Sequence, residues 1–252
     1  MSRRRRIEPI QLPDSPRYPD PLRRPQKRTQ QSGGGGDNPV VIDGDTIFWY
    51  DLSQQAGADG SEILLVPDLG GEGNDMTRPS VSTGWTLKQN IKNGLTVGRN
   101  NPAGLKENIA GLAETGGKYT FHLALNYTIG QTGNGFFLDS QSGNHILFCD
   151  FTSNTIGWFD GTNTPTFAGV SGWQVLTWVL NPGTGTGQMY RNGTLLGTGN
   201  YISRNWGPSP VLVGTFGAAN FLVSDIGEMI GYRNVGTAYR DPQMTYLVDK
   251  WL

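Results

Sequence analysis

Two carboxylates near the end of the chain, Asp225 and Glu228, are the first residues that could do chemistry. A glycosidase uses two carboxyl groups that face one substrate, one as the acid and the other as nucleophile or base. Side chains alternate between the two faces of a β-strand, so residues three apart point to opposite faces. The spacing therefore predicts no catalytic pair, and we expect each carboxylate to anchor a loop at an edge or turn.

Other reactive residue types are sparse. His122 and His145 are the only histidines, and neither has the spacing of a metal ligand or lies near a nucleophile elbow. His122 falls on the polar side of an alternating segment, which favours a surface position. Cys149 is the only cysteine, which excludes an intrachain disulfide and favours a small buried hydrophobe. We therefore predict no enzyme, no metal site and no cofactor.

Two glycine-rich segments could each be either a ligand-binding loop or an ordinary turn. The segment 68–75 has the oxygen-rich character of a calcium loop, but it lacks the EF-hand spacing. A turn stabilised by the side chains of Asn74 and Asp75 is the favoured interpretation. The segment 183–187 lacks the lysine of a phosphate-binding loop and is interpreted as a plain loop.

Charge divides the chain into a basic arm, residues 1–36, and an acidic body, residues 37–252. The arm has nine basic and three acidic residues, a balance of +6, whereas the body has eleven basic and eighteen acidic residues, a balance of −7. Six prolines in the arm disfavour helix and sheet, so we expect an extended strap with a glycine hinge at 33–36. The candidate anchoring residues of this arm are Arg3, Arg4, Arg5, Arg6, Arg17, Tyr18, Arg23, Arg24, Lys27 and Arg28.

The arm could bind either an acidic protein surface or nucleic acid. Its apolar residues, including Ile7, Leu12 and Leu22, suit a groove in a protein, so a protein partner is favoured and nucleic acid is disfavoured. No run of about 18 apolar residues occurs, and no hydrophobic segment follows Arg3 to Arg6. We expect neither a membrane anchor nor a secretory signal.

The body has the pattern of an all-β domain, with short apolar runs between Gly, Asn, Asp and Pro. The clearest alternation, at 119–127, predicts a half-buried antiparallel strand, and Asn192 and Gly193 predict a tight type I′ hairpin. Asp241 and Pro242 predict the start of a C-terminal helix that buries Met244, Leu247, Val248 and Trp251. A second, weaker helix is predicted at 105–112. Further strands are predicted at 40–42, 47–50, 136–138, 145–151, 156–159, 173–180, 188–196, 211–213 and 221–232.

Aromatic residues in loops could form platforms for sugar rings. Four tryptophans lie within predicted strands, where core packing explains them: Trp49, Trp158, Trp173 and Trp178. Trp206 lies in a predicted loop beside Gly207 and Pro208, and it is the candidate glycan platform.

Several segments together resemble the concanavalin A-like jelly roll of laminin-G-type, lectin and glucanase domains. They occur in that family's order over residues 43–252: Phe48 to Asp51, Asp68 to Asp75, Gly172 to Gln174, Tyr190 to Gly193, Ser224 to Tyr232 and Tyr246 to Trp251. The resemblance implies an antiparallel β-sandwich with a short C-terminal helix. No Glu-x-Asp-x-Glu motif of the glucanases is present. The resemblance therefore implies a scaffold and leaves the function to the site.

Domains of this kind are frequent in bacteriophage virions, and the arm adds a means of attachment. Our leading hypothesis is a non-enzymatic capsid decoration protein, made in the host cytoplasm and fastened outside the particle to the major capsid protein. A homo-oligomer is expected, with a trimer as the working assumption. One alternative is a carbohydrate-binding module on a tail fibre or spike, with a surface glycan as partner. Another is a jelly-roll shell protein whose arginine-rich arm binds the genome.

Overall fold

The structure is a computed structural model of the 252-residue chain. It describes residues 40–77, 85–100, 107–109, 117–128, 134–139, 146–150, 154–202, 211–213, 215–216, 220–221 and 223–252. The chain divides into two units, Met1–Asp37 and Asn38–Leu252, and every described residue belongs to the second. The basic arm, with all of its candidate anchoring residues, lies outside the described residues.

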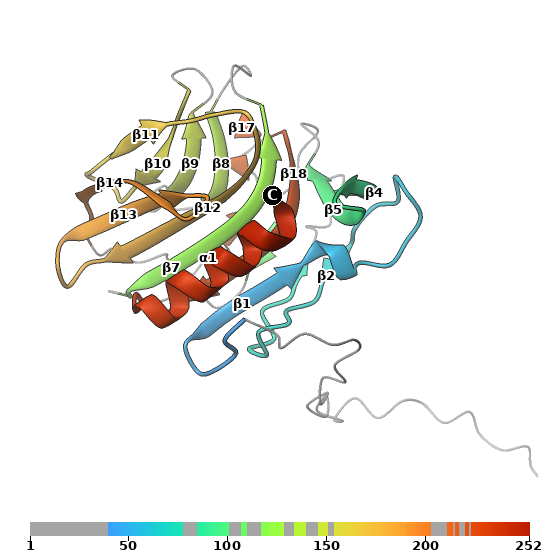
Figure 1. The fold of residues 1–252 in the computed structure, drawn as a ribbon, viewed down its shortest axis with the longest axis horizontal. Coiled ribbons are helices and arrows are strands. Elements are labelled where there is room, and N and C mark those ends of the chain that lie inside the picture. The colour runs from blue at the N-terminus through green and yellow to red at the C-terminus, as the bar shows by residue number, and fades with distance from the viewer. Residues whose placement is uncertain are drawn as a thin grey trace, which may run out of the picture. The chain divides into compact units, whose positions relative to one another are not determined.

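Two eight-stranded antiparallel sheets form the body (Figure 1). The first, here called the helix-covered sheet, has the order β14 (Thr194–Asn200), β13 (Thr186–Arg191), β12 (Gly172–Asn181), β7 (Tyr119–Tyr127), β18 (Ser224–Tyr232), β5 (Leu95–Asn100) and β4 (Thr86–Lys92). The strand β1 (Thr46–Asp51) pairs with one part of β18, and β5 pairs with the other part.

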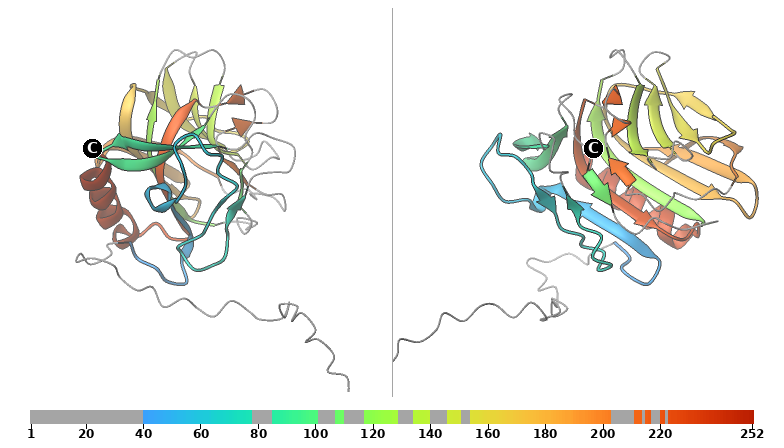
Figure 2. Two further views of the ribbon diagram at one scale, coloured as in Figure 1. Left: turned by 90° about the vertical axis from the view of Figure 1, so that its right-hand side faces the viewer. Right: turned by 180° about the vertical axis from the view of Figure 1, so that it is seen from behind.

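The opposite sheet completes the sandwich, as the views from the side and from behind show (Figure 2). Its order is β11 (Thr166–Ala168), β10 (Thr155–Phe159), β9 (Ile146–Asp150), β8 (Asn134–Asp139), β15 (Val211–Val213), β6 (Glu107–Ile109), β3 (Met76–Thr77) and β2 (Leu65–Val66). The short strands β16 (Thr215–Phe216) and β17 (Asn220–Phe221) pair with each other, and a 3-10 turn spans Leu52–Gln54. The predicted all-β antiparallel sandwich is confirmed.

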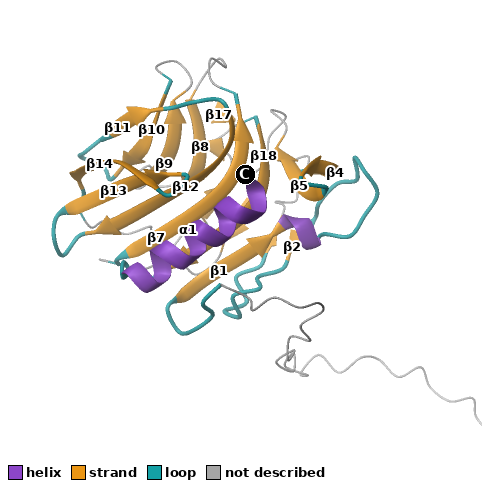
Figure 3. Cartoon of the chain, in the orientation of Figure 1, coloured by secondary structure: helices purple, strands orange, loops and turns teal. Residues whose placement is uncertain are grey.

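One α-helix, α1 (Thr237–Trp251), lies on the outer face of the helix-covered sheet (Figure 3). It packs against β7, β12 and β18 and buries Met244, Leu247 and Trp251, three of the four residues predicted for its inner face. Each such side chain contributes about 1.5–3 kcal/mol when it is fully removed from water. The predicted C-terminal helix is confirmed, although its start is not at Asp241.

The helix begins five residues earlier than predicted, at Thr237 in place of Pro242, so Pro242 lies inside it. A proline in this position cannot donate to the carbonyl four residues before it, which here belongs to Ala238. The buried amide of Gln243 supplies the missing donor when its nitrogen faces the carbonyl oxygens of Ala238, at 3.2 Å, and Tyr239, at 3.1 Å. Replacement of the lost backbone bond explains why the helix continues through its proline.

The helix also changes the environment of β7. Tyr119, Phe121, Leu123, Leu125 and Tyr127 point into the sandwich as predicted. The other face was predicted to meet solvent, but α1 covers it, and Ala124 packs in one cluster with residues of α1. The prediction of a half-buried strand is therefore wrong: eight of its nine residues are buried.

Two tight hairpins use the same dipeptide. Asn192 and Gly193, with φ angles of 51° and 80°, connect β13 to β14 as predicted for a type I′ turn. Asn93 and Gly94 do the same between β4 and β5, with φ angles of 52° and 74°. The second hairpin carries the same Asn-Gly signal, which sequence reasoning missed.

Two further predictions of local structure are wrong. Residues 40–42 form no strand, although Val40 is buried and packs with the residues under α1. The segment 105–112 contains the strand β6 where a helix was predicted, and its other residues lie outside the described part of the chain. The pairing of β6 with β15, which is distant in the sequence, outweighs the local helical pattern.

Candidate functional site

A buried carboxylate, Glu228, lies at the centre of the contact between α1 and the helix-covered sheet. Its side chain is fully buried, and its Oε1 accepts a hydrogen bond from Trp49 Nε1 at 2.6 Å. Its Oε2 accepts from Trp251 Nε1 at 3.1 Å and from Lys250 Nζ at 2.8 Å. One carboxylate thus joins β1, β18 and the last turn of α1.

A β-bulge places Glu228 on this face. Asp225 pairs with Asn126 and Glu228 with Ala124, and these partners are two apart on β7, so the two carboxylates share a face. The pairing shifts at Gly227, where an added Cβ would lie 2.7 Å from the Trp251 ring. The predicted placement on opposite faces is therefore wrong, because a bulge adds one residue to the strand.

Neither carboxylate anchors an edge loop, as the sequence had suggested. Asp225 lies within β18 and accepts hydrogen bonds from Arg99 Nε at 2.6 Å and Nη2 at 2.9 Å. Asp225 is 6% exposed, so the carboxylate of this bidentate ion pair is buried, whereas its arginine partner is partly exposed. Each carboxylate has its own cationic partner, which leaves neither of them as a free acid or nucleophile.

Lys250 joins two carboxylates. Its Nζ lies 2.8 Å from Asp51 Oδ2 and 2.8 Å from Glu228 Oε2, and it also donates to the Tyr246 hydroxyl at 3.0 Å. Asp51 and Glu228 are paired directly across β1 and β18. All three ammonium protons are therefore used inside the protein.

The pKa values reflect this arrangement. Burial raises the pKa of Glu228, and the neighbouring charge of Asp51 raises it further, while Lys250 opposes both. Burial alone would lower the pKa of Lys250, but Glu228 and Asp51 outweigh burial and raise it. Lys250 is thus a firmly charged structural ammonium, unsuited to act as a base.

Above this cluster lies an open concavity of about 590 Å³ on the outer surface of α1. Its lining residues recur every three or four positions along the helix: Pro242, Thr245, Tyr246, Asp249 and Lys250. The Tyr246 hydroxyl donates to Glu228 Oε2 at 3.3 Å and accepts from Lys250, whose ammonium also lies 5.4 Å from the centre of the Tyr246 ring. The partly exposed ring of Tyr246 is therefore a fixed aromatic surface.

One polar group of this concavity is unengaged. The Asp249 side chain is exposed, and its carboxylate makes no hydrogen bond or ion pair with any residue that the structure describes. By contrast, Lys250 is saturated and Thr245 Oγ1 donates to the Asp241 carbonyl at 3.0 Å. The concavity, here called the α1 platform, thus offers an aromatic ring, a proline ring and one free acceptor.

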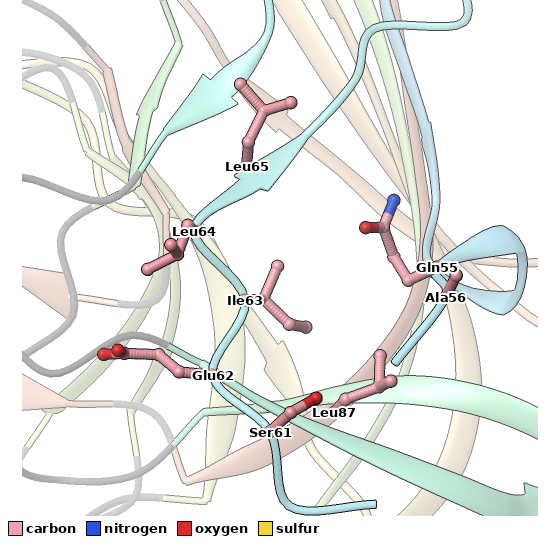
Figure 4. A pocket seen from close by; sticks show the side chains of 8 residues that line it. All are labelled: Gln55, Ala56, Ser61, Glu62, Ile63, Leu64, Leu65 and Leu87. Carbon is pink, nitrogen blue, oxygen red and sulfur yellow. The ribbon is translucent and has the colours of Figure 1, made fainter. Parts of the chain in front are cut away.

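A second concavity, of about 270 Å³, opens between the segment before β2 and the start of β4 (Figure 4). Ile63 points toward Gln55 in its interior, and the side chains of Leu64 and Leu65 are 59% and 46% exposed. The cavity has no aromatic wall, and its volume is below the roughly 300–1,000 Å³ that is usual for ligand pockets. Its lining is Gln55, Ala56, Ser61, Glu62, Ile63, Leu64, Leu65 and Leu87.

His122 was predicted at the surface, and this prediction is wrong. It is 1% exposed because the start of α1 covers it. Its Nε2 donates to the Tyr239 carbonyl at 2.8 Å, so its Nδ1 accepts from Thr177 Oγ1 at 2.9 Å. Burial lowers its pKa to about 4. It is a neutral core histidine that docks the helix.

The loop 68–75 holds itself together through Asp68. Its Oδ1 accepts from the backbone nitrogens of Trp49 at 2.9 Å and Gly70 at 2.8 Å, and Asn74 Nδ2 donates to the Ile47 carbonyl at 2.6 Å. Asp75 Oδ1 accepts from Asp68 N at 2.8 Å. In the described part of the chain no group of His, Cys, Asp and Glu could hold a metal.

The sequence-predicted site residues are otherwise not brought together. Trp206 and His145 lie outside the described residues, and Cys149 lies in β9. Trp49, Trp158 and Trp178 are buried as predicted, whereas Trp173 is half-buried and stacks on Trp251 at 5.4 Å. Sequence reasoning assigned no role to Tyr246, Asp249 or Lys250, although their spacing of three and four residues signals one helix face.

Solved structures with a similar fold are known, although no family model and no curated protein sequence matches the chain. Botulinum neurotoxin type C, whose cell entry depends on interaction with two ganglioside molecules, matches with a TM-score of 0.59 and 10% identity over 82% of this chain and 52% of that one. The binding domain of Paraclostridial mosquitocidal protein 1 matches with a TM-score of 0.56 and 11% identity over 80% and 52%. Trypanosoma rangeli sialidase, in complex with a difluoro-KDN, matches with a TM-score of 0.53 and 11% identity over 82% and 33%.

These likenesses concern the fold. The chain spans about half the length of the toxin structures it matches and a third of the sialidase. At 10–11% identity they show a lectin-like β-sandwich and leave the ligand to be argued from this chain's own residues. No helix among the described residues is long and apolar enough to cross a membrane.

Proposed function

We propose that this chain is a non-enzymatic carbohydrate-binding module and that the α1 platform is its binding surface. The observation that carries the proposal is the partly exposed ring of Tyr246, fixed from below by Glu228 and Lys250 in a concavity of about 590 Å³. Aromatic faces and a few placed polar groups are what small-ligand sites use for shape and orientation. The likeness in fold to a botulinum neurotoxin whose cell entry depends on gangliosides, and to a sialidase, supports a sugar ligand.

An enzymatic role is disfavoured by how the carboxylates are used. Asp51 and Glu228 both bind Lys250, and Asp225 binds Arg99. Hydrolysis of a glycosidic bond needs one protonated and one free carboxyl group that reach the same sugar. Glu228 is fully buried beneath α1, so it cannot touch a ligand on the surface.

The experiment is a glycan array probed with the full chain, followed by titration of the best ligands. Tyr246→Leu removes the ring and should abolish binding, while Tyr246→Phe keeps the ring and should retain most of it. Near-ultraviolet circular dichroism confirms that each variant is folded. Loss of binding in Trp206→Ala, with Tyr246→Leu unaffected, would move the site to Trp206.

A second candidate function concerns the arm. The charge balance of +6 in residues 1–36 against −7 in the body favours attachment of the arm to an acidic protein surface. We propose on this basis that the arm anchors the module to a larger assembly, with the major capsid protein of a phage, outside the particle, as the specific expectation. A homo-oligomer, such as a trimer, would repeat the contact and raise its avidity. Deletion of residues 1–36 should abolish binding to stripped particles, and undiminished binding would refute the anchor.

A further inference from the structure

We propose that the α1 platform selects neutral sugars and rejects acidic ones, with Asp249 as the ligand-binding acceptor. This inference rests on the proposed function and specifies its ligand class. The proposed ligand class, neutral sugars, differs from the acidic sugar analogue in complex with the sialidase of similar fold.

The first step is the charge of the surface. Asp249 and Lys250 are the charged residues that line the α1 platform, and the buried carboxylates of Asp51 and Glu228 lie beneath it, against Lys250. Lys250 is held 2.8 Å from each of the two buried carboxylates, so its charge is already compensated. The platform therefore presents net negative charge, and buried charges are screened less by salt than exposed ones.

The second step is the supply of hydrogen-bond donors. An acidic sugar would need a free ammonium, guanidinium or backbone N–H for its carboxylate. Lys250 already donates its three ammonium hydrogens to Asp51, Glu228 and Tyr246. Among the residues that line the platform no charged donor remains.

The third step is what the platform does offer. The exposed Asp249 carboxylate has two oxygens that make no bond within the described part of the chain, and it lies three residues, almost one turn, beyond Tyr246. Neighbouring hydroxyls of a pyranose can each donate to one carboxylate oxygen, and hydrogen bonds to a charged acceptor are about twice as strong as neutral ones. The C–H face of the same ring would lie against Tyr246 and Pro242, because aromatic faces are electron-rich.

The experiment compares matched ligands on the full chain. Oligosaccharides that end in galactose, glucose or N-acetylglucosamine are titrated beside the same oligosaccharides capped with sialic acid. We expect the neutral forms to bind at least about tenfold more tightly. Asp249→Asn should weaken neutral binding about tenfold, the loss of one charge-assisted contact. The control Asp59→Asn changes another exposed carboxylate, 58% exposed, and should leave binding unchanged.

A charge reversal gives the sharpest outcome. Asp249→Lys should lose neutral ligands and reduce the discrimination against sialylated ones. Tighter binding of the sialylated forms by the unaltered chain, or full neutral binding by Asp249→Asn, would overturn the assignment of ligand class while glycan binding itself stood. If no oligosaccharide of either class bound, the proposed function itself would fail.

Discussion

Asp51 and Glu228 lie directly opposite each other on β1 and β18, buried, with the single ammonium of Lys250 2.8 Å from both. Like charges across a strand pair destabilise a sheet. The ammonium reverses this effect and at the same time fixes the last turn of α1, whose Trp251 donates to the same Glu228. The attachment of the helix and the stability of the strand pair therefore depend on the same ammonium group.

Removal of the shared ammonium tests this relationship. Lys250→Met leaves two buried carboxylates face to face and should lower the free energy of unfolding by about 3–5 kcal/mol at pH 7. Because the pKa of Glu228 is already raised, acid should protonate it and reduce the loss. Urea denaturation at pH 7 and pH 5 measures both effects.

The matched control for that variant is Lys92→Met, whose exposed ammonium donates only to the Leu252 carbonyl at 2.9 Å among the described residues. Its effect should stay within about 0.5 kcal/mol. Adding Glu228→Gln to Lys250→Met should restore part of the loss, since one buried charge disappears. If the double variant is no more stable than Lys250→Met, the repulsion is not the cause.

Acid should weaken the folded state through His122. Its folded pKa of about 4 is below its ordinary value of 6.5, so the unfolded chain takes up this proton first as the pH falls. The contribution is fully present above pH 6.5 and is lost as the pH falls toward 4. The difference between 6.5 and about 4 corresponds to about 3 kcal/mol.

Glu228 acts in the opposite direction, because its raised pKa means that the folded state gains a proton earlier than the unfolded one. To isolate the contribution of His122, the free energy of unfolding in urea is therefore compared between the unaltered chain and His122→Gln from pH 8 to pH 4. The difference in stability between them should shrink with acidification. A constant difference over this range would show that the pKa of His122 is the same in the folded and unfolded states.

Gly227 should tolerate no side chain. A Cβ at this position would lie 2.7 Å from three atoms of the Trp251 ring, so Gly227→Ala should lower the free energy of unfolding by about 1–3 kcal/mol. Gly44→Ala is the control, since nothing lies within 4 Å of its Cβ position. Thermal unfolding of both variants checks the difference, and equal midpoints would contradict the close approach of Trp251.

The hairpin between β13 and β14 should depend on Gly193. Its φ of 80° is unfavourable for residues with a Cβ, so Gly193→Ala should cost about 1 kcal/mol. Gly193→Asn should cost less, because asparagine tolerates this region. Chemical denaturation separates the two, and an equal loss in both variants would point to a cause other than the backbone angle.

Local pattern was enough to predict the all-β class, the strand at 119–127, the Asn192–Gly193 turn and the inner face of the last helix. These features depend on side chains a few residues apart. Where the helix docks is not a local property: Thr120, His122 and Ala124 share a face that looks solvent-exposed in the sequence but is buried once α1 packs on β7. His122 was misplaced for this reason.

The candidate site was missed for a related reason. Asp225 and Glu228 share a face only because the pairing shifts at Gly227. A β-bulge of this kind cannot be predicted from residue types alone. Tyr246 and Lys250 are ordinary helix residues in the sequence. Both bind Glu228, and Lys250 also binds Asp51, which is 199 positions away. Contacts between such distant segments are set by tertiary packing.

The hydrogen bond from Trp49 to Glu228 joins residues 179 positions apart. Until that long loop closes, β18 lacks one neighbour and the helix lacks the cluster that fixes it. Loop closure must be completed before these contacts repay its entropy, so proteins dominated by distant pairings fold slowly, in milliseconds to seconds. The cluster that steadies the ring of Tyr246 therefore exists only after segments from both ends of the described body have met, so the order of the α1 surface depends on nearly the whole fold.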